Sequence, residues 1–305
     1  MTHLTFDPAP AAQQPGRLYV VATPIGNLGD ISLRAIQTLS SVDLIACEDT
    51  RHTKKLCRHL NITTPLVSYF REREQEKATA LLKLLHEGKQ IALVSDAGTP
   101  AICDPGAVLV NKARAAGIDI IAIAGPSALA AALSIAGLTQ ASFFFGGFLP
   151  ANAAARKQLF KALAPLPYPL IFYEAPHRIR ASLADMAATL GDRQALLFRE
   201  LTKMHEECLE GPLSVLREQI KDRVKGELVL IIHGAALQSP PPEDLDDLLR
   251  WYRDEQHSSL KQAVARIAAD LDLPRSLVYK KALAVWQEIA PQACPGPKSV
   301  LTSSE

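Results

Sequence analysis

The residues best suited to chemistry in this chain gather in three loops rich in glycine, proline and small polar side chains. The loops are TPIGNLGD (residues 23–30), SDAGTPAICDPG (95–106) and AGPSA (124–128), and each follows a short apolar run typical of a buried strand. Glycine lets the backbone approach a ligand closely, and proline fixes the shape of a loop. Any one loop could be an ordinary strand-to-helix connection, but together they predict a ligand site at strand ends.

The motifs that usually hold a nucleotide or a metal do not occur in this sequence. GxGxxG and GxxxxGKS/T are absent, which argues against hydride transfer and nucleoside triphosphate chemistry. GxSxG, HExxH and CxxC are absent too, so the commonest hydrolase and zinc signatures are missing and we expect no metal.

Loops of this kind suit a ligand that is recognised mainly by backbone groups and carries little negative charge. S-adenosylmethionine has these properties, because its adenine edge, ribose diol and zwitterionic tail can all bond to main-chain donors and acceptors. Its methyl group is already activated, so the protein needs neither a metal nor a nucleophilic side chain. The remaining chemistry is positioning, which contributes about 7–11 kcal/mol, and removal of a proton from the acceptor.

The elements that must position these loops alternate along the chain. In the first part, strands are expected at 18–22, 44–47, 91–94 and 118–122, and helices at 32–39, 71–87, 106–116 and 128–136. In the second part, strands are expected at 143–148, 169–173, 195–199 and 228–233, and helices at 156–163, 177–190 and 213–220. Alternation of strand and helix over residues 17–127 predicts a mostly parallel sheet with helices on its faces.

A proline segment, QSPPP at 238–242, separates this region from a helical tail. Helices are expected at 245–252, 260–271 and 277–289, the middle one opened by Ser259 with Gln262 at capping-box spacing. The last two resemble a helix-turn-helix with Arg275, Lys280 and Lys281 on the second helix, which would suit RNA. Acidic residues open the tail, at positions 244, 246 and 247, so packing against the body is the alternative.

Composition limits the class of protein. The chain has 305 residues, 48% of them hydrophobic, enough for two domains and a tail. No stretch reaches about 18 apolar residues and the first 16 lack the features of an export signal, so we expect no membrane partner. Five scattered cysteines suit a reducing cytoplasm, and a net charge of +1 means that any RNA-binding charge must be local.

Seven stretches, in order between residues 17 and 234, are together highly specific. They are LYVVATPIGNLGDIS, EDTRHT, VSDAGTPAICDPG, AGPSALAAALSIAGL, FFFGGFLP, FYEAPHRI and RELTKMHE. As a set they resemble the bacterial 16S ribosomal RNA cytidine 2′-O-methyltransferase I family, a branch of the tetrapyrrole methylase superfamily. The resemblance implies an α/β, two-domain tetrapyrrole-methylase-like fold (class III methyltransferase) with S-adenosylmethionine between the domains, and a homodimer.

The resemblance and the composition together divide the chain into four parts. We expect a disordered extension at 1–16, an N-terminal α/β domain at 17–127, a C-terminal α/β domain at 128–237 and a small helix-turn-helix-like tail at 243–290.

Matched motifs also imply which residues contact the cofactor. They are Thr23, Pro24, Ile25, Thr99, Pro100, Ile102, Ser127, Ala128, Tyr173, Glu174, Leu201 and Glu227. Cys103 departs from the small polar residue expected at its position, which affects packing rather than chemistry. Asp96 and Asp104 are expected to hold the shape of their loop or to face the acceptor.

The proton acceptor is not fixed by the motifs. The predicted catalytic residues are Asp49, Arg51, Glu200 and Lys203. A carboxylate or a desolvated lysine can act as base, whereas arginine or lysine can hold flanking phosphates. Glu48 and Glu206 belong to the same charged motifs, and surface ion pairing is the alternative for each residue. His177 is a further possible base, with a structural role or an RNA contact as alternatives.

The favoured hypothesis is therefore a methyltransferase that modifies a cytidine ribose in the decoding region of 16S ribosomal RNA. Its expected partner is the RNA or the small ribosomal subunit, and neither DNA nor a membrane. One alternative is a small-molecule, tetrapyrrole-type methylase of the same fold. Another is a non-catalytic protein that binds RNA or the ribosome and would show no saturable cofactor site.

Overall fold

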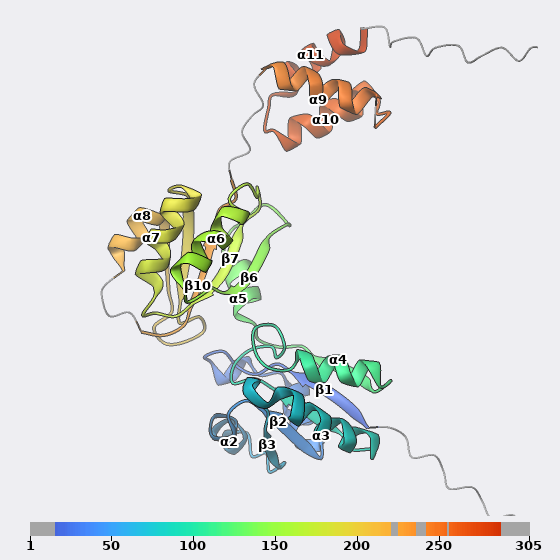
Figure 1. Ribbon diagram of the computed structural model, residues 1–305, viewed down its shortest axis with the longest axis vertical. Helices are drawn as coiled ribbons and strands as arrows, with labels where there is room; N and C mark the ends of the chain where they lie inside the picture. Colours follow the sequence, from blue (N-terminus) through green and yellow to red (C-terminus); the bar gives the residue numbers. More distant parts are fainter. Residues whose placement is uncertain (1–15, 221–224, 236–241, 255, 288–305) are drawn as a thin grey trace, which may run out of the picture. The chain divides into compact units, whose positions relative to one another are not determined.

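A computed structural model describes residues 16–220, 225–235, 242–254 and 256–287 (Figure 1). The chain forms two compact units, which divide between Ala235 and Ala236. The first unit contains two five-stranded sheets and the second contains helices. No helix among the described residues is long and apolar enough to cross a membrane.

The first sheet is fully parallel and has the strand order β3-β2-β4-β1-β5. Its strands are β1 (Arg17–Val21), β2 (Leu44–Cys47), β3 (Leu66–Ser68), β4 (Ile91–Val94) and β5 (Asp119–Ile123). Its helices are α1 (Leu33–Ser41), α2 (Thr50–His59), α3 (Glu74–His86) and α4 (Ala107–Ala115), with short 3-10 turns at Leu28–Asp30 and Arg71–Arg73.

Side chains on the first sheet alternate between two cores, so helices cover both faces. On one face, Leu18 and Leu93 pack with Leu81 of α3 and Leu109 of α4. On the other face, Val21 and Val94 belong to the core that contains Leu39 of α1 and Cys57 of α2. Because the strands are buried on both sides, they read as continuous apolar runs. The predicted parallel sheet is confirmed.

The second sheet is mixed and has the strand order β6-β7-β10-β8-β9. Its strands are β6 (Phe144–Phe148), β7 (Leu170–Glu174), β8 (Gln194–Arg199), β9 (Glu207–Pro212) and β10 (Leu228–Ile232). The β6–β7 pair is parallel and the others are antiparallel. The helices α6 (Ala153–Leu163), α7 (Ile179–Leu190) and α8 (Leu213–Gln219) contribute to the core on one face, and α5 (Ala128–Ile135) contributes to the core on the other.

Three elements were not predicted from the sequence: α2, β3 and β9. Helix α2 has only two buried side chains, Thr53 and Cys57, so the apolar periodicity of a covered helix is missing. Strand β3 has three residues, and β9 is a polar strand at the edge of its sheet. The other elements lie where predicted, with ends shifted by a few residues, and the α/β fold class with helices at the C-terminal end is confirmed.

The second unit contains α9 (Pro242–Asp254), α10 (Leu260–Asp270) and α11 (Arg275–Gln287). Leu249, Ile267 and Val278, one from each helix, are buried in a shared core. The predicted capping box is present, because the Ser259 hydroxyl accepts from the Gln262 backbone and the Gln262 side chain accepts from the Ser259 backbone.

The predicted boundary between residues 127 and 128 falls at the start of α5, after the last strand of the first sheet and before the first strand of the second. Apart from Gly16, the predicted N-terminal extension lies outside the described residues, as do residues 236–237 and 288–290. The domain limits therefore stay predictions.

Candidate active site

Three loops at the carboxyl ends of the first sheet are bonded to one another. The backbone N–H groups of Thr23 and Gly98 each donate to the carbonyl of the other, at 2.9 and 3.0 Å. Gly98 has φ +78°, a conformation that favours glycine. The Thr99 hydroxyl donates to the Pro126 carbonyl at 3.1 Å. The three glycine-rich loops thus form one surface, as expected for adjacent parallel strands.

The far end of the central loop is fastened by charged side chains. Arg71 donates to the Cys103 carbonyl at 2.8 Å, and the Gly106 backbone N–H donates to Glu74 at 2.7 Å. The Asp49 backbone N–H donates to the Asp96 carboxylate at 3.1 Å, which ties the ends of β2 and β4 together. This contact fits the first of the two roles expected for Asp96, which also lines the cavity described below.

A cavity of about 330 Å³ lies between this surface and the second sheet. That volume is at the lower end of the range for small-molecule sites. The lining residues come from both sheets and include carboxylates, small residues and aromatic rings. They are Ile25, Asp96, Ala97, Gly98, Thr99, Ile102, Cys103, Asp104, Ser127, Ala128, Phe148, Tyr173, Glu174, Ala175, Pro176, Gly226, Glu227, Leu228 and Val229.

Most of the predicted cofactor contacts line this cavity. They are Ile25, Thr99, Ile102, Ser127, Ala128, Tyr173, Glu174 and Glu227. Pro24 and Pro100 are adjacent in the chain to the lining residues Ile25 and Thr99, and Thr23 is bonded to Gly98 of the lining. Buried Leu201 shares a core with Ile25. The loops and the second domain therefore meet at one cavity, and the contacts themselves stay predictions.

Tyr173 connects the second sheet to the third loop. Its hydroxyl accepts a hydrogen bond from the Leu129 backbone N–H at 3.0 Å, in the first turn of α5. Burial raises the pKa of Tyr173 to about 12, so the hydroxyl stays neutral at physiological pH. Phe148 packs edge-on against the Tyr173 ring at 5.4 Å, and 56% of Phe148 is exposed.

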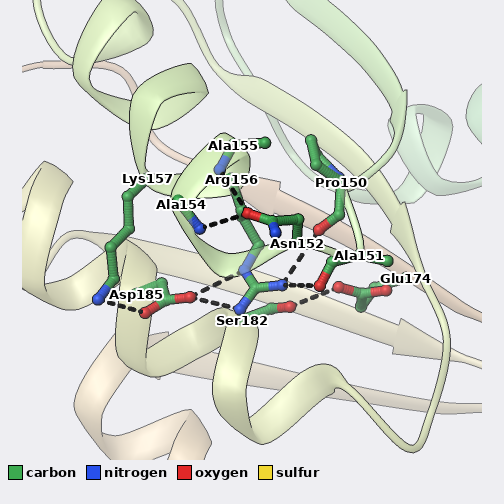
Figure 2. A network of polar contacts seen from close by, with 10 residues as sticks. All are labelled: Pro150, Ala151, Asn152, Ala154, Ala155, Arg156, Lys157, Glu174, Ser182 and Asp185. Carbon is green, nitrogen blue, oxygen red and sulfur yellow. Dashed lines mark hydrogen bonds and ion pairs between the residues drawn. The ribbon is translucent and has the colours of Figure 1, made fainter.

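Glu174 lines the cavity, but its carboxylate is engaged elsewhere (Figure 2). Its side chain is 0% exposed, pairs with Arg178 at 2.6 Å and accepts from the Ser182 hydroxyl and the Ala175 backbone. Arg156 of α6 is also buried, and it donates to Asp185 of α7, the helix that carries Ser182, and to the Pro150 carbonyl. These contacts fix the end of β7 on α7, so Glu174 shapes the cavity wall.

The predicted catalytic pair Glu200 and Lys203 forms a network with Glu227. Lys203 Nζ lies 2.8 Å from Glu200 Oε1 and 3.1 Å from Glu227 Oε2, and the Glu227 backbone N–H donates to Glu200 at 3.0 Å. Gly226, at φ +99°, permits this approach, because an added Cβ would lie 2.3 Å from Glu200 Oε1. The network therefore positions Glu227 at the cavity.

The other predicted catalytic pair, Asp49 and Arg51, lies at the start of α2. The Arg51 guanidinium is 2.7 Å from the Asp49 carboxylate, which also accepts from the Arg51 backbone as the helix cap. Hydrogen bonds from Arg51 lower the pKa of Asp49 to about 2. Neither side chain lines the cavity described here, although the Asp49 backbone bonds to Asp96 in its wall.

Two other carboxylates, Asp104 and Glu48, have pKa values that are raised rather than lowered. The pKa of Asp104, which lines the cavity, is raised because burial disfavours the charged form and Asp96 carries like charge nearby; Ser95 and Arg71 act in the other direction. The pKa of Glu48 is also raised, by burial and by the charges of Asp104 and Asp96.

The remaining candidates from the charged motifs lie outside the lining. His177 is exposed after β7, and Glu206 accepts from the Thr202 backbone at 2.6 Å. Cys103 lines the cavity, and burial raises the pKa of its thiol, so the thiol stays protonated.

Sequence reasoning missed several lining residues. Phe148 stands in FFFGGFLP and Pro176 in FYEAPHRI, both recognised motifs, so proximity to those motifs was an available signal. Gly226 could have been found from its position beside Glu227. Asp104, expected to hold the shape of its loop or to face the acceptor, lines the cavity, and its role stays a prediction.

The lining residues fit S-adenosylmethionine. Four carboxylates and no lysine, arginine or histidine stand among the lining residues of the described chain. Glu174 is paired with Arg178 and Glu227 with Lys203, so Asp96 and Asp104 are the lining carboxylates that can attract a sulfonium or an ammonium group. Ile25, Ile102 and Tyr173 offer apolar surface for adenine, and the backbone around Gly98 is open to polar contacts.

Comparison with known proteins gives the class first. Residues 17–217 match the family model for Tetrapyrrole (Corrin/Porphyrin) Methylases. Uroporphyrin III C-methyl transferase from Thermus thermophilus has a TM-score of 0.52 at 18% identity, over 71% of this chain and 97% of that chain. A diphthine synthase has a TM-score of 0.56 at 14% identity, over 72% and 90%. The fold is that of the tetrapyrrole methylases.

Sequence relatives then define the family more narrowly. Ribosomal RNA small subunit methyltransferase I of Vibrio cholerae is 47% identical over 86% of this chain and 93% of its own length. The protein of the same name from Escherichia coli O157:H7 is 46% identical over 88% and 95%. The chain therefore belongs to the ribosomal RNA small subunit methyltransferase I family of the tetrapyrrole methylases. A further uroporphyrin-III C-methyl transferase structure, 17% identical with a TM-score of 0.52, is a complex with S-adenyl homocysteine.

Proposed function

We propose that this protein transfers a methyl group from S-adenosylmethionine to the ribose 2′-hydroxyl of a cytidine in the decoding region of 16S ribosomal RNA. The observation that carries the proposal is the identity of 46–47% of the aligned residues, over most of both chains, with proteins named as ribosomal RNA small subunit methyltransferases. The acidic, two-sided cavity supports the cofactor assignment.

The protein's own part in this chemistry is to orient the acceptor and to take its proton. S-adenosylmethionine supplies, when bound, a methyl group already activated by the sulfonium. Thr99, Ser127 and Ala128 stand on backbone fixed by the loop contacts described above and hold the cofactor. Glu227, fixed by Lys203, is placed for the polar groups of the cofactor.

Asp104 is the residue best placed to accept the 2′-hydroxyl proton. It lines the cavity and its raised pKa makes it a better base than Asp49, whose pKa of about 2 reflects a carboxylate committed to Arg51. Arg51, with 88% of its side chain exposed, is suited to hold a phosphate beside the target nucleotide. The half-exposed Phe148 ring offers a stacking surface for a nucleobase.

We infer further that the protein acts in the cytoplasm, where its RNA substrate is, and as a homodimer. The dimer follows from the family resemblance, and sedimentation of the purified protein tests it. A mass of twice 33.0 kDa is expected.

Transfer of labelled methyl to naked 16S RNA and to purified small subunits tests the main proposal. We expect label on one cytidine. The phosphodiester that follows this cytidine should resist alkali, because the ribose 2′-oxygen of the cytidine is blocked by the methyl group. Failure on both substrates, with labelling of a tetrapyrrole, would favour the small-molecule alternative. A protein without saturable S-adenosylmethionine binding would instead be a pure RNA-binding protein.

A further inference from the structure

The second unit has a groove of its own between α10 and α11. Its volume is about 330 Å³ and its lining residues come from both helices. They are Lys261, Val264, Ala265, Arg275, Ser276 and Tyr279. Two cations and an aromatic ring therefore surround an apolar floor.

The basic side chains of this unit fall into two groups. Arg250 pairs with Asp247, Arg253 with Asp254, and Lys281 with Asp246. These contacts pair three of the acidic residues of α9, which are Asp246, Asp247 and Asp254.

Lys261, Arg266, Arg275 and Lys280 have no carboxylate partner in the part of the chain that the structure describes, and Lys261 and Arg275 line the groove. Asp270 and Asp272, at the end of α10 and beyond it, are not among the residues that line the groove. Asp246 and Asp247 at the start of the tail are thus paired within the unit, and Lys261 and Arg275 leave positive charge at the groove.

The start of α11 presents these groups together. Arg275 and Tyr279 are four residues apart, as are Ser276 and Lys280, so all four lie on neighbouring parts of one helix surface. All four are exposed, Tyr279 to 49%, and none is required for the buried core of the bundle. An exposed aromatic ring between unpaired cations is the arrangement that binds a phosphate chain and stacks a base.

We propose that this groove binds single-stranded or looped segments of the substrate RNA, with Lys261 and Arg275 on phosphates and Tyr279 stacked on a base. The inference rests on the proposed function for its RNA, and charge complementarity selects the occupant. Lys280 extends the basic surface along α11. The groove thus gives the enzyme an RNA contact in addition to its catalytic cavity.

The test compares the full-length double variant Lys261→Gln/Arg275→Gln with Arg266→Gln. Arg266 is exposed on the same helix α10 and outside the groove lining, so it is a charge-loss control. Binding of a labelled 16S RNA fragment is measured across a salt series. The double variant should weaken binding about tenfold and reduce the slope of log affinity against log salt by about 0.7 for each lost phosphate contact.

Tyr279 is tested by Tyr279→Ala and Tyr279→Phe. Loss of a stacked base should weaken binding about tenfold in the alanine variant, whereas phenylalanine should bind within about twofold of the original protein. Circular dichroism and S-adenosylmethionine affinity should be unchanged in all variants, since the groove and the catalytic cavity are in different units.

The inference is wrong if the double variant binds RNA no more weakly than Arg266→Gln. It is also wrong if the variant binds naked RNA normally and loses affinity only for small subunits, because the groove would then contact a protein. Methyl transfer by the unaltered enzyme tests the proposed function separately, and it can succeed when the groove variants show no effect.

Discussion

The two walls of the cavity both carry carboxylates, but in different settings. On the wall from the second sheet, Glu174 is paired with Arg178, and Glu227 is paired with Lys203. On the wall from the first sheet, the pKa of Asp104 is raised by burial and by the like charge of Asp96. Paired carboxylates hold structure, whereas a poorly stabilised one can take up a proton. We therefore propose that the second wall shapes the site and places Glu227 for the cofactor, and that Asp104 of the first wall supplies the acid–base chemistry.

The largest expected effect comes from Asp104→Asn. It keeps the shape of the side chain and removes the base, so the single-turnover methyl transfer rate should fall about 10²- to 10⁴-fold. Loss of one carboxylate from the lining should also weaken S-adenosylmethionine binding, so the affinity is measured by calorimetry and the rate is compared at saturating cofactor. The matched variant Asp49→Asn should lose less than about tenfold, and a larger loss in Asp49→Asn would reverse the assignment.

Glu174→Ala tests the structural role of the second wall. Removing the fully buried carboxylate leaves Arg178 and Ser182 without their acceptor, and should lower the free energy of unfolding by about 3 kcal/mol. Chemical denaturation followed by circular dichroism measures this loss. A change below about 1 kcal/mol would show that the contacts of Glu174 with Arg178 and Ser182 contribute little to stability.

The pH dependence of the rate distinguishes Asp104 from Asp49 as the base. A base acts when deprotonated, so a raised pKa moves the acid limb of the profile to higher pH. The rate should decline about tenfold per pH unit below a midpoint above the ordinary aspartate value of about 3.9. If Asp49 were the base, activity would persist toward its pKa of about 2 for as long as the protein stayed folded.

Lys203→Gln should have the smallest effect on stability. Lys203 is 29% exposed, so solvent screens its pairs, and the loss should be below about 1 kcal/mol. Desolvation raises the pKa of Glu200, but hydrogen bonds from the Lys203 side chain and the Glu227 backbone outweigh it, so the pKa is lowered. Burial lowers the pKa of Lys203, but its hydrogen bonds to Glu200 and Glu227 outweigh burial, so that pKa is raised.

The contribution of the Lys203 ion pairs to the free energy of unfolding should be present at neutral pH. It should be lost as the pH falls through the folded pKa of Glu200 or rises through that of Lys203. The denaturation midpoints of the original protein and of Lys203→Gln are measured from acidic to alkaline pH. A difference that grew at either extreme would contradict the pairing.

Much of the fold could be predicted because the buried strands of the first sheet are distinct apolar runs bounded by glycine and proline. Helix α2 and strand β9 were missed because each is largely polar, and only tertiary contacts show that they are regular. Local propensity cannot recover such elements.

For the site, sequence placed the loops correctly but not the state of each carboxylate. Glu174 and Asp104 both follow apolar runs in recognised motifs. The state of each carboxylate depends on residues of other elements. Ser182 on α7 donates to Glu174, whereas the charge of Asp96, after β4, raises the pKa of Asp104. These contacts exist only once the sheets have formed.

The most direct test of the account is S-adenosylmethionine titration of Ala128→Phe. Ala128 lines the cavity at the start of α5, so a phenyl ring there should fill the cofactor space and abolish measurable binding. Ala130→Phe places the same ring on an exposed position of the same helix and should bind as the original protein does. Unchanged affinity in folded Ala128→Phe would contradict the claim that the cavity between the two sheets holds the cofactor.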